Sequence, residues 1–286
     1  MSAENVRLTD ELNIRRCRLS KSYRAIAAYI DEHYERASSM TASSLAHEAG
    51  VSESTVIRFA IALGYDGYPS LQKAMQYQVR KLMTTDERFS LGVEMTREDV
   101  LSTVLKEDML NIRRTVEQID REAFTKAVDF LLNARNIYIL GLRSAAPLAQ
   151  FMTYYLNFIF DNVEQVASGL ADVFEDLLRI QPEDVLIGIS FPRYSTRTVE
   201  AIRFAHSAGA RVIAITDSLR SPLNSEADLC LTAATEMPSF VDSLAAPLSL
   251  INALIVALGL KKREELHSHL TRLEDIWSKN SVYLRK

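Results

Sequence analysis

The chain has 286 residues, of which 48% are hydrophobic and 24% are charged, proportions that are ordinary for a soluble globular protein. This length predicts two domains or one large domain. The formal net charge of -4 excludes a protein that coats nucleic acid nonspecifically, so any contact with DNA requires a local basic face.

The cysteines and the apolar runs indicate a cytoplasmic protein. Cys17 and Cys230 lie far apart without metal-ligand spacing, so we expect plain thiols in a reducing compartment, no metal and no cofactor. Residues Met1 to Asp10 are polar and mixed in charge, unlike a signal peptide. The run from Leu244 to Leu260 is interrupted by Pro247 and is short for a membrane span, so we predict a buried helix and no membrane partner.

The first 83 residues predict an all-α domain. Met1 to Leu19 is polar and rich in arginine, which indicates a loose arm or a short helix. Residues 20–34 repeat apolar side chains at helical spacing. Residues 64–70 contain two glycines and a proline and predict a turn, after which residues 71–83 form another helix.

Residues 44–59 predict a helix, a glycine turn and a second helix. Thr41 caps the first helix, and Gly50 can adopt the positive φ that ends it. Ser52 is expected to cap the second helix by accepting a hydrogen bond from the backbone N–H of Ser54 or Thr55. The apolar residues of this segment can close one small core: Leu45, Ala46, Ala49, Val51, Val56, Phe59, Ala60 and Leu63.

The outer face of the second helix is polar and predicts an interface with DNA. A short polar helix held in this way fits the major groove. Ala46, Gly50 and Val56 occupy helix-turn-helix spacing, although an ordinary αα-corner within a larger domain would have the same spacing. The residues that we expect at the DNA are Ser52, Glu53, Ser54, Thr55 and Arg58.

Residues 84–97 lack periodicity and predict a linker, and residues 98–286 form the second domain. Two amphipathic helices, 98–119 and 121–132, begin it, the second capped by Asp120. Short apolar runs then alternate with helices, which predicts an α/β fold with a five-stranded parallel sheet flanked by helices. The predicted strands are residues 137–140, 163–166, 184–190, 211–216 and 228–232, and the helices among and after them are about 145–160, a short one through 177, 196–208, 242–258 and a last one to 279.

Two loops at strand ends carry residues suited to an anion. Ligands of open parallel sheets bind beyond the carboxyl ends of the strands, where the strand order reverses. Residues 141–144 follow the first strand, and residues 190–198 follow the third. Hydroxyls and backbone N–H groups at a helix N-terminus bind anions without a metal. Helix capping by Ser195 or Thr196 is compatible with this site, whereas Arg143 and Arg193 could also be solvated loop charges.

The chain resembles the RpiR family of transcriptional regulators, in which a helix-turn-helix domain precedes a sugar isomerase (SIS) domain. Residues 46–59 and 63–65 carry the first half of the resemblance, and residues 139–144, 187–200 and 213–217 carry the second. The resemblance implies a regulator whose operator affinity is adjusted by a phosphorylated sugar or a related metabolite. With the boundaries given above, residues 1–83 would be the DNA-binding domain and residues 98–286 the effector-binding and dimerisation domain.

The resemblance also implies an effector site in the two strand-end loops, and both loops depart from the family pattern. The usual Gly-x-Gly-x-Ser loop lacks its second glycine here, and a longer loop with Pro192 and Tyr194 replaces Ser-x-Ser-Gly. Two arginines enter these loops, and a guanidinium suits phosphate and carboxylate equally. We therefore expect an anionic effector, phosphorylated or carboxylated, to bind Arg143, Ser144, Ser190, Arg193, Ser195 and Thr198.

An SIS-type sugar-phosphate isomerase is the alternative, and it requires a general base beside the substrate. His206 follows the anion loop, whereas His267 and His269 lie two residues apart on a helix and form a poor metal pair. Glu236 and Asp242 flank the exit of the fifth strand, but Asp242 is also a natural helix cap. We expect no catalytic residue and no enzymatic activity.

The helix at residues 242–258 is apolar nearly all round, which indicates burial in a core or against a second copy. We predict a homodimer or homotetramer formed by the second domain. A symmetric dimer would place two DNA-binding domains on a palindromic operator about one helical turn apart. A pure assembly role, with the second domain only a dimerisation module, remains a third interpretation.

Overall fold

The computed structural model describes residues 20–95, 99–167, 169–237 and 239–284. The arm predicted for Met1 to Leu19 lies outside these residues. The chain divides into two compact units, Met1–Gly92 and Val93–Lys286, so the division falls within the segment 84–97 where the sequence predicts a linker. Each unit has a hydrophobic core of its own and is described separately.

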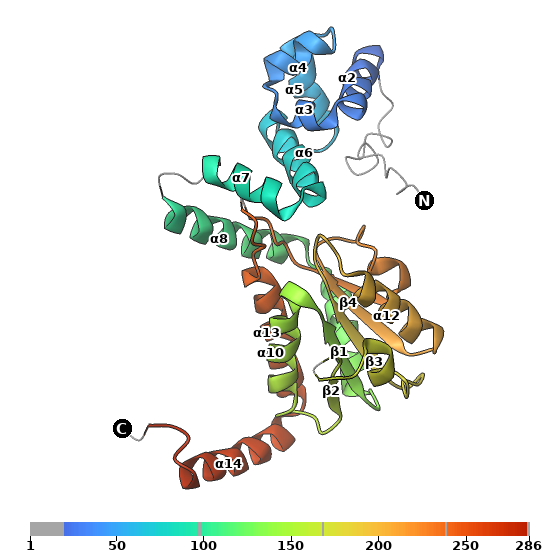
Figure 1. Ribbon diagram of the computed structural model, residues 1–286, viewed down its shortest axis with the longest axis vertical. Helices are drawn as coiled ribbons and strands as arrows, with labels where there is room; N and C mark the ends of the chain where they lie inside the picture. Colours follow the sequence, from blue (N-terminus) through green and yellow to red (C-terminus); the bar gives the residue numbers. More distant parts are fainter. Residues whose placement is uncertain (1–19, 96–98, 168, 238, 285–286) are drawn as a thin grey trace. The chain divides into compact units, whose positions relative to one another are not determined.

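The first unit is helical (Figure 1). The sequence misses α3, because six residues are too few to show a helical repeat, yet its Tyr34 and Ala37 are buried. Helix α6 begins at Tyr68 rather than Leu71, since Pro69 lies in the first turn, where its missing N–H has no cost. The helices before the boundary are α2 (Lys21–Glu32), α3 (Tyr34–Ser39), α4 (Ala42–Glu48), α5 (Glu53–Ala62) and α6 (Tyr68–Leu82).

The segment predicted to be an irregular linker is helical over most of its length. Helix α7 spans Thr85–Met95, so that part of the prediction is wrong. The physical reason lies at its start, where Thr84 and Glu87 form reciprocal bonds. The Glu87 carboxylate accepts from the Thr84 N–H at 2.7 Å, and the Thr84 hydroxyl accepts from the Glu87 N–H at 3.3 Å. This capping box starts a helix without an apolar repeat.

The second unit contains a five-stranded parallel sheet in the order β2-β1-β3-β4-β5. All five predicted strands are present within a residue or two of their expected ends. Because β2 lies on one side of β1 and β3 on the other, the strand order reverses between β1 and β3. The strands are β1 (Ile137–Gly141), β2 (Val163–Gln165), β3 (Val185–Ile189), β4 (Arg211–Thr216) and β5 (Leu229–Thr232).

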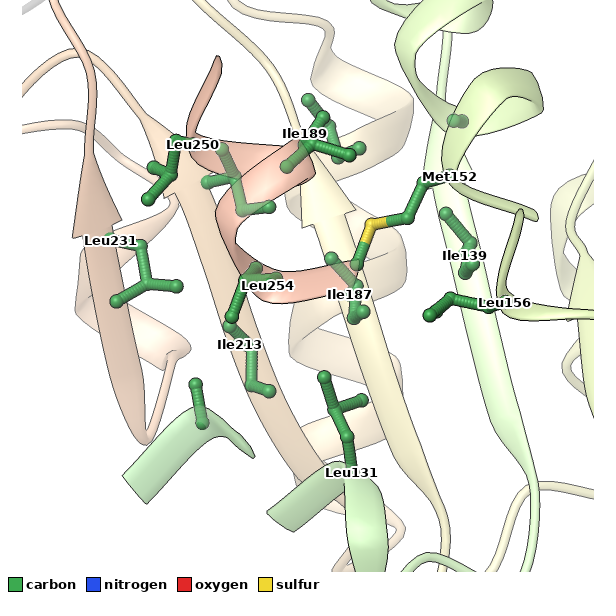
Figure 2. Close-up of a cluster of buried hydrophobic side chains, with 14 of the residues drawn as sticks. Leu131, Ile139, Met152, Leu156, Ile187, Ile189, Ile213, Leu231, Leu250 and Leu254 are labelled. Atoms are coloured by element: carbon green, nitrogen blue, oxygen red, sulfur yellow. The ribbon is translucent and has the colours of Figure 1, made fainter. Parts of the chain in front are cut away.

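Alternate residues of each strand face opposite layers of helices. Ile187 and Ile189 pack with α9, α10 and α13 on one face, and Figure 2 shows these side chains interdigitating with Leu250 and Leu254. Leu186 packs with α11 and α12 on the other face. The helices of this unit are α8 (Val100–Gln118), α9 (Arg121–Leu132), α10 (Ala146–Leu156), α11 (Val173–Asp176), α12 (Thr196–Ser207), α13 (Ala245–Lys261) and α14 (Arg263–Lys279), with short 3-10 helices at Arg143–Ala145 and Asn224–Glu226.

The burial of helix α13 explains why its sequence is apolar. It begins at Ala245 with Leu244 as its N-cap, so the predicted capping role of Asp242 is wrong. Seven of its residues are buried within the same unit. Packing within its own unit therefore covers these seven residues, whereas Val256 and Leu260 of the same helix are 60% and 71% exposed.

None of the helices in the described parts of the chain is individually both long and apolar enough to cross a membrane. Helices α13 and α14 satisfy the length and composition criteria only as a pair that is bent by 102°.

Candidate functional site

The turn between α4 and α5 has the geometry that the sequence predicts. Gly50 has a φ of 65°, and the chain reverses through two bonds after α4. The Gly50 N–H donates to the His47 carbonyl at 3.2 Å, and the Val51 N–H donates to the Ala46 carbonyl at 2.9 Å. This pair of bonds is a Schellman motif, which satisfies carbonyls that the helix end would leave open. Thr41 caps α4 as predicted, accepting from the Ser44 N–H at 3.1 Å.

Helix α5 buries one face and exposes the predicted DNA-contacting residues. Val56, Phe59 and Ala60 lie in the core of the first unit. On the other side, Glu53, Ser54 and Arg58 are exposed. Arg58 donates from Nε to the Ser54 carbonyl at 3.2 Å, which leaves the end of its guanidinium facing outward. The geometry therefore matches an exposed recognition helix, whereas contact with DNA by these residues stays a prediction.

The cap of α5 differs from the prediction. Ser52 occupies the N-cap position, but its hydroxyl forms no bond to a backbone N–H. It lies instead 3.0 Å from the Ser54 hydroxyl and 2.8 Å from the Thr55 hydroxyl. The first-turn N–H groups of α5 are consequently not consumed by this side chain. Backbone N–H groups at a helix N-terminus are suitable donors to a phosphate.

Two isoleucines on the same face of α5 were missed by the sequence interpretation. Ile57 is 39% exposed and Ile61 is 56% exposed. Helical spacing places Ile57 between Glu53 and Arg58 on the outer face. An exposed apolar side chain at this position suits contact with a thymine methyl group. The sequence carries a signal for both isoleucines. Neither belongs to the predicted core, and a large apolar residue outside the core lies on the surface.

The loop after β1 is packed tightly against the helix that follows it. A Cβ at Gly141 would lie 2.6 Å from the Ala145 carbonyl oxygen, so only glycine fits this strand end. The next loop residue with unusual geometry is Arg143, whose φ is 55°. Left-handed backbone costs a non-glycine residue on the order of 1–3 kcal/mol and is concentrated at functional sites. Arg143 and Ser144 are both exposed at this edge of the sheet.

The loop after β3 carries the hydroxyl cluster. Ser190 is only 5% exposed and accepts from the Ser195 N–H at 3.2 Å. Ser195 caps α12 by accepting from the Thr198 N–H at 3.4 Å, so the capping interpretation is confirmed for Ser195. Arg193 in the same loop has a φ of 62°. Two arginines in left-handed conformation thus follow the two strands between which the strand order reverses.

Thr198 has the most informative environment in this loop. The residue is fully buried, and its hydroxyl oxygen has no hydrogen-bond partner among the residues that the structure describes. A buried hydroxyl without a partner costs roughly 1–3 kcal/mol, so such groups are rare in folded proteins. The methyl group of Thr198 packs toward β3, 3.9 Å from where a Cβ of Gly188 would lie.

Residues at the end of β4 hold the β3 loop, and the sequence interpretation did not assign them. Tyr194 donates its hydroxyl to Asp217 Oδ1 at 2.6 Å. The Thr216 hydroxyl lies 3.3 Å from the same oxygen and 2.9 Å from the Ser221 hydroxyl. Burial, with a smaller contribution from the Asp217 charge, raises the pKa of the Cys230 thiol to about 11, so this thiol stays protonated near neutral pH. Thr216 is the last residue of a predicted strand and Asp217 directly follows it, which was the signal for them.

The candidate general bases have structural partners or exposed positions. Glu236 pairs with Arg114 Nη1 at 2.5 Å, and its backbone is held by the buried amide of Asn111 through bonds of 2.7 and 3.2 Å. His206 lies exposed in the last turn of α12. Within the described ranges no group of three or more His, Cys, Asp or Glu side chains could hold a metal ion.

Comparison with known proteins identifies both units. Residues 6–81 match the rpiR-family helix-turn-helix domain, and residues 130–257 match the SIS domain. The chain is 27% identical over 271 residues to an uncharacterized HTH-type transcriptional regulator of Caldanaerobacter subterraneus, a match that covers 90% of this chain and 92% of the relative.

Two solved structures share this fold. The sugar isomerase domain of an RpiR transcription factor from Sphaerobacter thermophilus is 27% identical, with a TM-score of 0.58, covering 60% of this chain and 96% of that one. The Vibrio vulnificus NanR protein complexed with ManNAc-6P is 19% identical, with a TM-score of 0.56, covering 95% and 98% of the two chains. The chain therefore belongs to the RpiR family and is an HTH-type transcriptional regulator with a SIS domain.

Proposed function

We propose that this regulator binds an operator through α5 and that an anionic metabolite at the ends of β1 and β3 controls its operator affinity. The observation that carries the effector site is the buried Thr198 hydroxyl without a partner. It lies at the start of α12, where backbone N–H groups and the partial positive charge of the helix favour an anion. Ser190 and Ser195 supply further hydroxyl groups in the same loop.

The two arginines support a ligand that carries at least one full negative charge. Arg143 and Arg193 follow neighbouring strands and adopt left-handed backbone, which costs a non-glycine residue on the order of 1–3 kcal/mol. A shared phosphate or carboxylate would offset the repulsion between two guanidiniums and bind each of them. Because NanR of Vibrio vulnificus was solved with ManNAc-6P, sugar phosphates are the first class to test. Sugar acids, which have the same charge type, are the second.

A role without catalysis is part of this proposal. The Glu236 carboxylate, the best placed acidic candidate for a base, is paired with Arg114. Releasing a buried or half-buried carboxylate from its arginine costs free energy that a general base would have to regain. Incubation of the purified protein with sugar phosphates should therefore leave the substrates unchanged. We also propose that the protein acts as a homodimer or homotetramer, because pairing two DNA-binding domains doubles the number of phosphate contacts with DNA.

One operator titration, with and without metabolites, tests both halves. A thermal-shift screen first selects the anion, because a ligand that binds only the folded state raises its melting temperature. Arg58→Ala should weaken operator binding by about 1–3 kcal/mol, roughly 5- to 160-fold, without changing the response to the anion. Arg143→Ala and Arg193→Ala should abolish the response and leave effector-free affinity unchanged.

The matched control is Arg197→Ala, which removes an exposed arginine of the same region that pairs with Asp172 at 3.1 Å. It should keep the full response to the anion. If Arg143→Ala and Arg193→Ala both respond like the unmodified protein, the two arginines are solvated loop charges and the proposed effector site is wrong. If Arg58→Ala binds the operator as before, the placement of α5 in the groove is wrong.

A further inference from the structure

Helix α14 is only lightly held by its own unit: Leu266 packs against the core, the His269 ring lies 3.3 Å from the Phe158 carbonyl, and the Trp277 ring centroid lies 6.4 Å from that of Phe158. It has 17 residues, and none of them is buried. Most helical stability in proteins comes from packing of an apolar face, and these few contacts leave most of α14 exposed. Its bend of 102° from α13 directs it away from the helical layer, as Figure 1 shows for the C-terminal helix.

The helix nevertheless carries an apolar seam. Leu266, Leu270, Leu273 and Trp277 follow one another at spacings of four, three and four residues, the repeat that brings two helices together. Leu266 and Leu270 line one wall of an open groove of about 800 Å³. The other walls come from Tyr155 of α10, Phe158 just after that helix, and Val256 and Leu260 of α13, of which Leu260 is 71% exposed.

The seam and groove are suited to a second copy of this chain. Since α14 supplies both an apolar seam and a wall of the groove, a two-fold axis through the groove mates the same surface with itself, as isologous dimers require. We propose that two copies pair through their C-terminal helices, with the α14 helices antiparallel and each lying in the groove of the other. This inference deepens the proposed function, since it names the surface through which the regulator dimerises.

Charge selects the antiparallel arrangement. When Leu266 is matched with Trp277 of the second copy and Leu270 with Leu273, the same count places Glu264 opposite Lys279. Glu264 lies in the first turn of α14 and Lys279 in the last. Opposite charges and opposite ends of the helix dipole therefore meet at both ends of the pair. A parallel pair would place Glu264 against Glu264 and Lys279 against Lys279, which is repulsive.

Sedimentation equilibrium of the full chain tests the surface. Leu270→Asp places a charge in the seam of both copies, and we expect the dissociation constant of the dimer to rise at least about 100-fold. Leu101→Asp on α8 is the matched control, because Leu101 is 70% exposed and belongs to a different apolar stripe. It should leave the dimer intact. A monomeric unmodified protein, or a dimer lost through Leu101→Asp and kept in Leu270→Asp, overturns the inference.

A disulfide experiment tests the direction of the pair without disturbing the seam. In a chain with Cys17→Ser, Glu264→Cys and Lys279→Cys are made separately, and the buried Cys230 remains. Mild oxidation of the two variants mixed together should give a covalent dimer, whereas either variant alone should give little. Efficient linking of Glu264→Cys with itself would overturn the antiparallel arrangement. Operator and effector titrations are read separately, so loss of this interface is distinguishable from loss of the proposed effector site.

Discussion

Gly50 between α4 and α5 and Arg143 after β1 have similar positive φ angles, 65° and 55°. In the first case the backbone needs a left-handed residue to close a helix, and glycine supplies it without strain. In the second case a long charged side chain occupies the same conformation, as Arg193 does at 62°. The helical turn therefore carries no backbone strain at this position, whereas the strand-end loops retain strain together with the side chains that a ligand would contact.

A second glycine, Gly141, extends this comparison. It is required because a side chain there would clash with its neighbours, not because the backbone needs a positive φ. A Cβ at Gly50 would have no atom within 4 Å, whereas a Cβ at Gly141 would lie 2.6 Å from the Ala145 oxygen and 3.0 Å from the Ala149 Cβ. Gly141→Ala should lower the free energy of unfolding by about 3 kcal/mol, the upper end of the usual cost of overpacking, because the clash is with backbone. Urea unfolding followed by circular dichroism measures the loss. A loss below about 1 kcal/mol would show that the β1 loop shifts freely.

The sequence predicts a region well when the interactions that determine it join residues close together along the chain. The α4–α5 turn is determined by residues within a few positions of Gly50, so its glycine, the Thr41 cap and its core residues are predictable. The Ser52 hydroxyl differs from the prediction, because it lies against the hydroxyls of Ser54 and Thr55 instead of a backbone N–H. The parallel sheet is also predictable, because its buried strands are continuous apolar runs. The bond between Tyr194 and Asp217 joins residues of two different loops, and only the assembled sheet brings them together. The isolation of the Thr198 hydroxyl likewise depends on everything packed around it.

Exchanging the residue types at the two left-handed positions tests the comparison directly. Gly50→Ala should destabilise the first unit by about 1 kcal/mol, since an L-residue pays for left-handed backbone even in open space. Arg143→Gly should do the reverse, raising the melting temperature of the second unit by about 1–3 °C while abolishing the response to the anion. Differential scanning calorimetry of the full chain measures both.

Arg143→Ala serves as the control for Arg143→Gly, because it removes the guanidinium and keeps the strained backbone. It should lose the response without the gain in stability. If Arg143→Gly is less stable than the unmodified protein, the left-handed conformation is not strained and the contrast with Gly50 fails.

A final change of about the same size concerns the unpartnered hydroxyl that distinguishes the strand-end site from the helical turn. Thr198→Val keeps the shape of the side chain and its packing toward β3, and it removes the buried oxygen that has no partner. Without ligand, the free energy of unfolding should rise by about 1 kcal/mol, because the desolvation cost of that oxygen disappears. With the selected anion, the thermal shift should shrink and the dissociation constant should rise about 10-fold, the equivalent of one lost hydrogen bond. A variant that loses stability and keeps full anion affinity would mean that the hydroxyl has a structural partner instead, and the strand-end site would then lose the observation on which it rests.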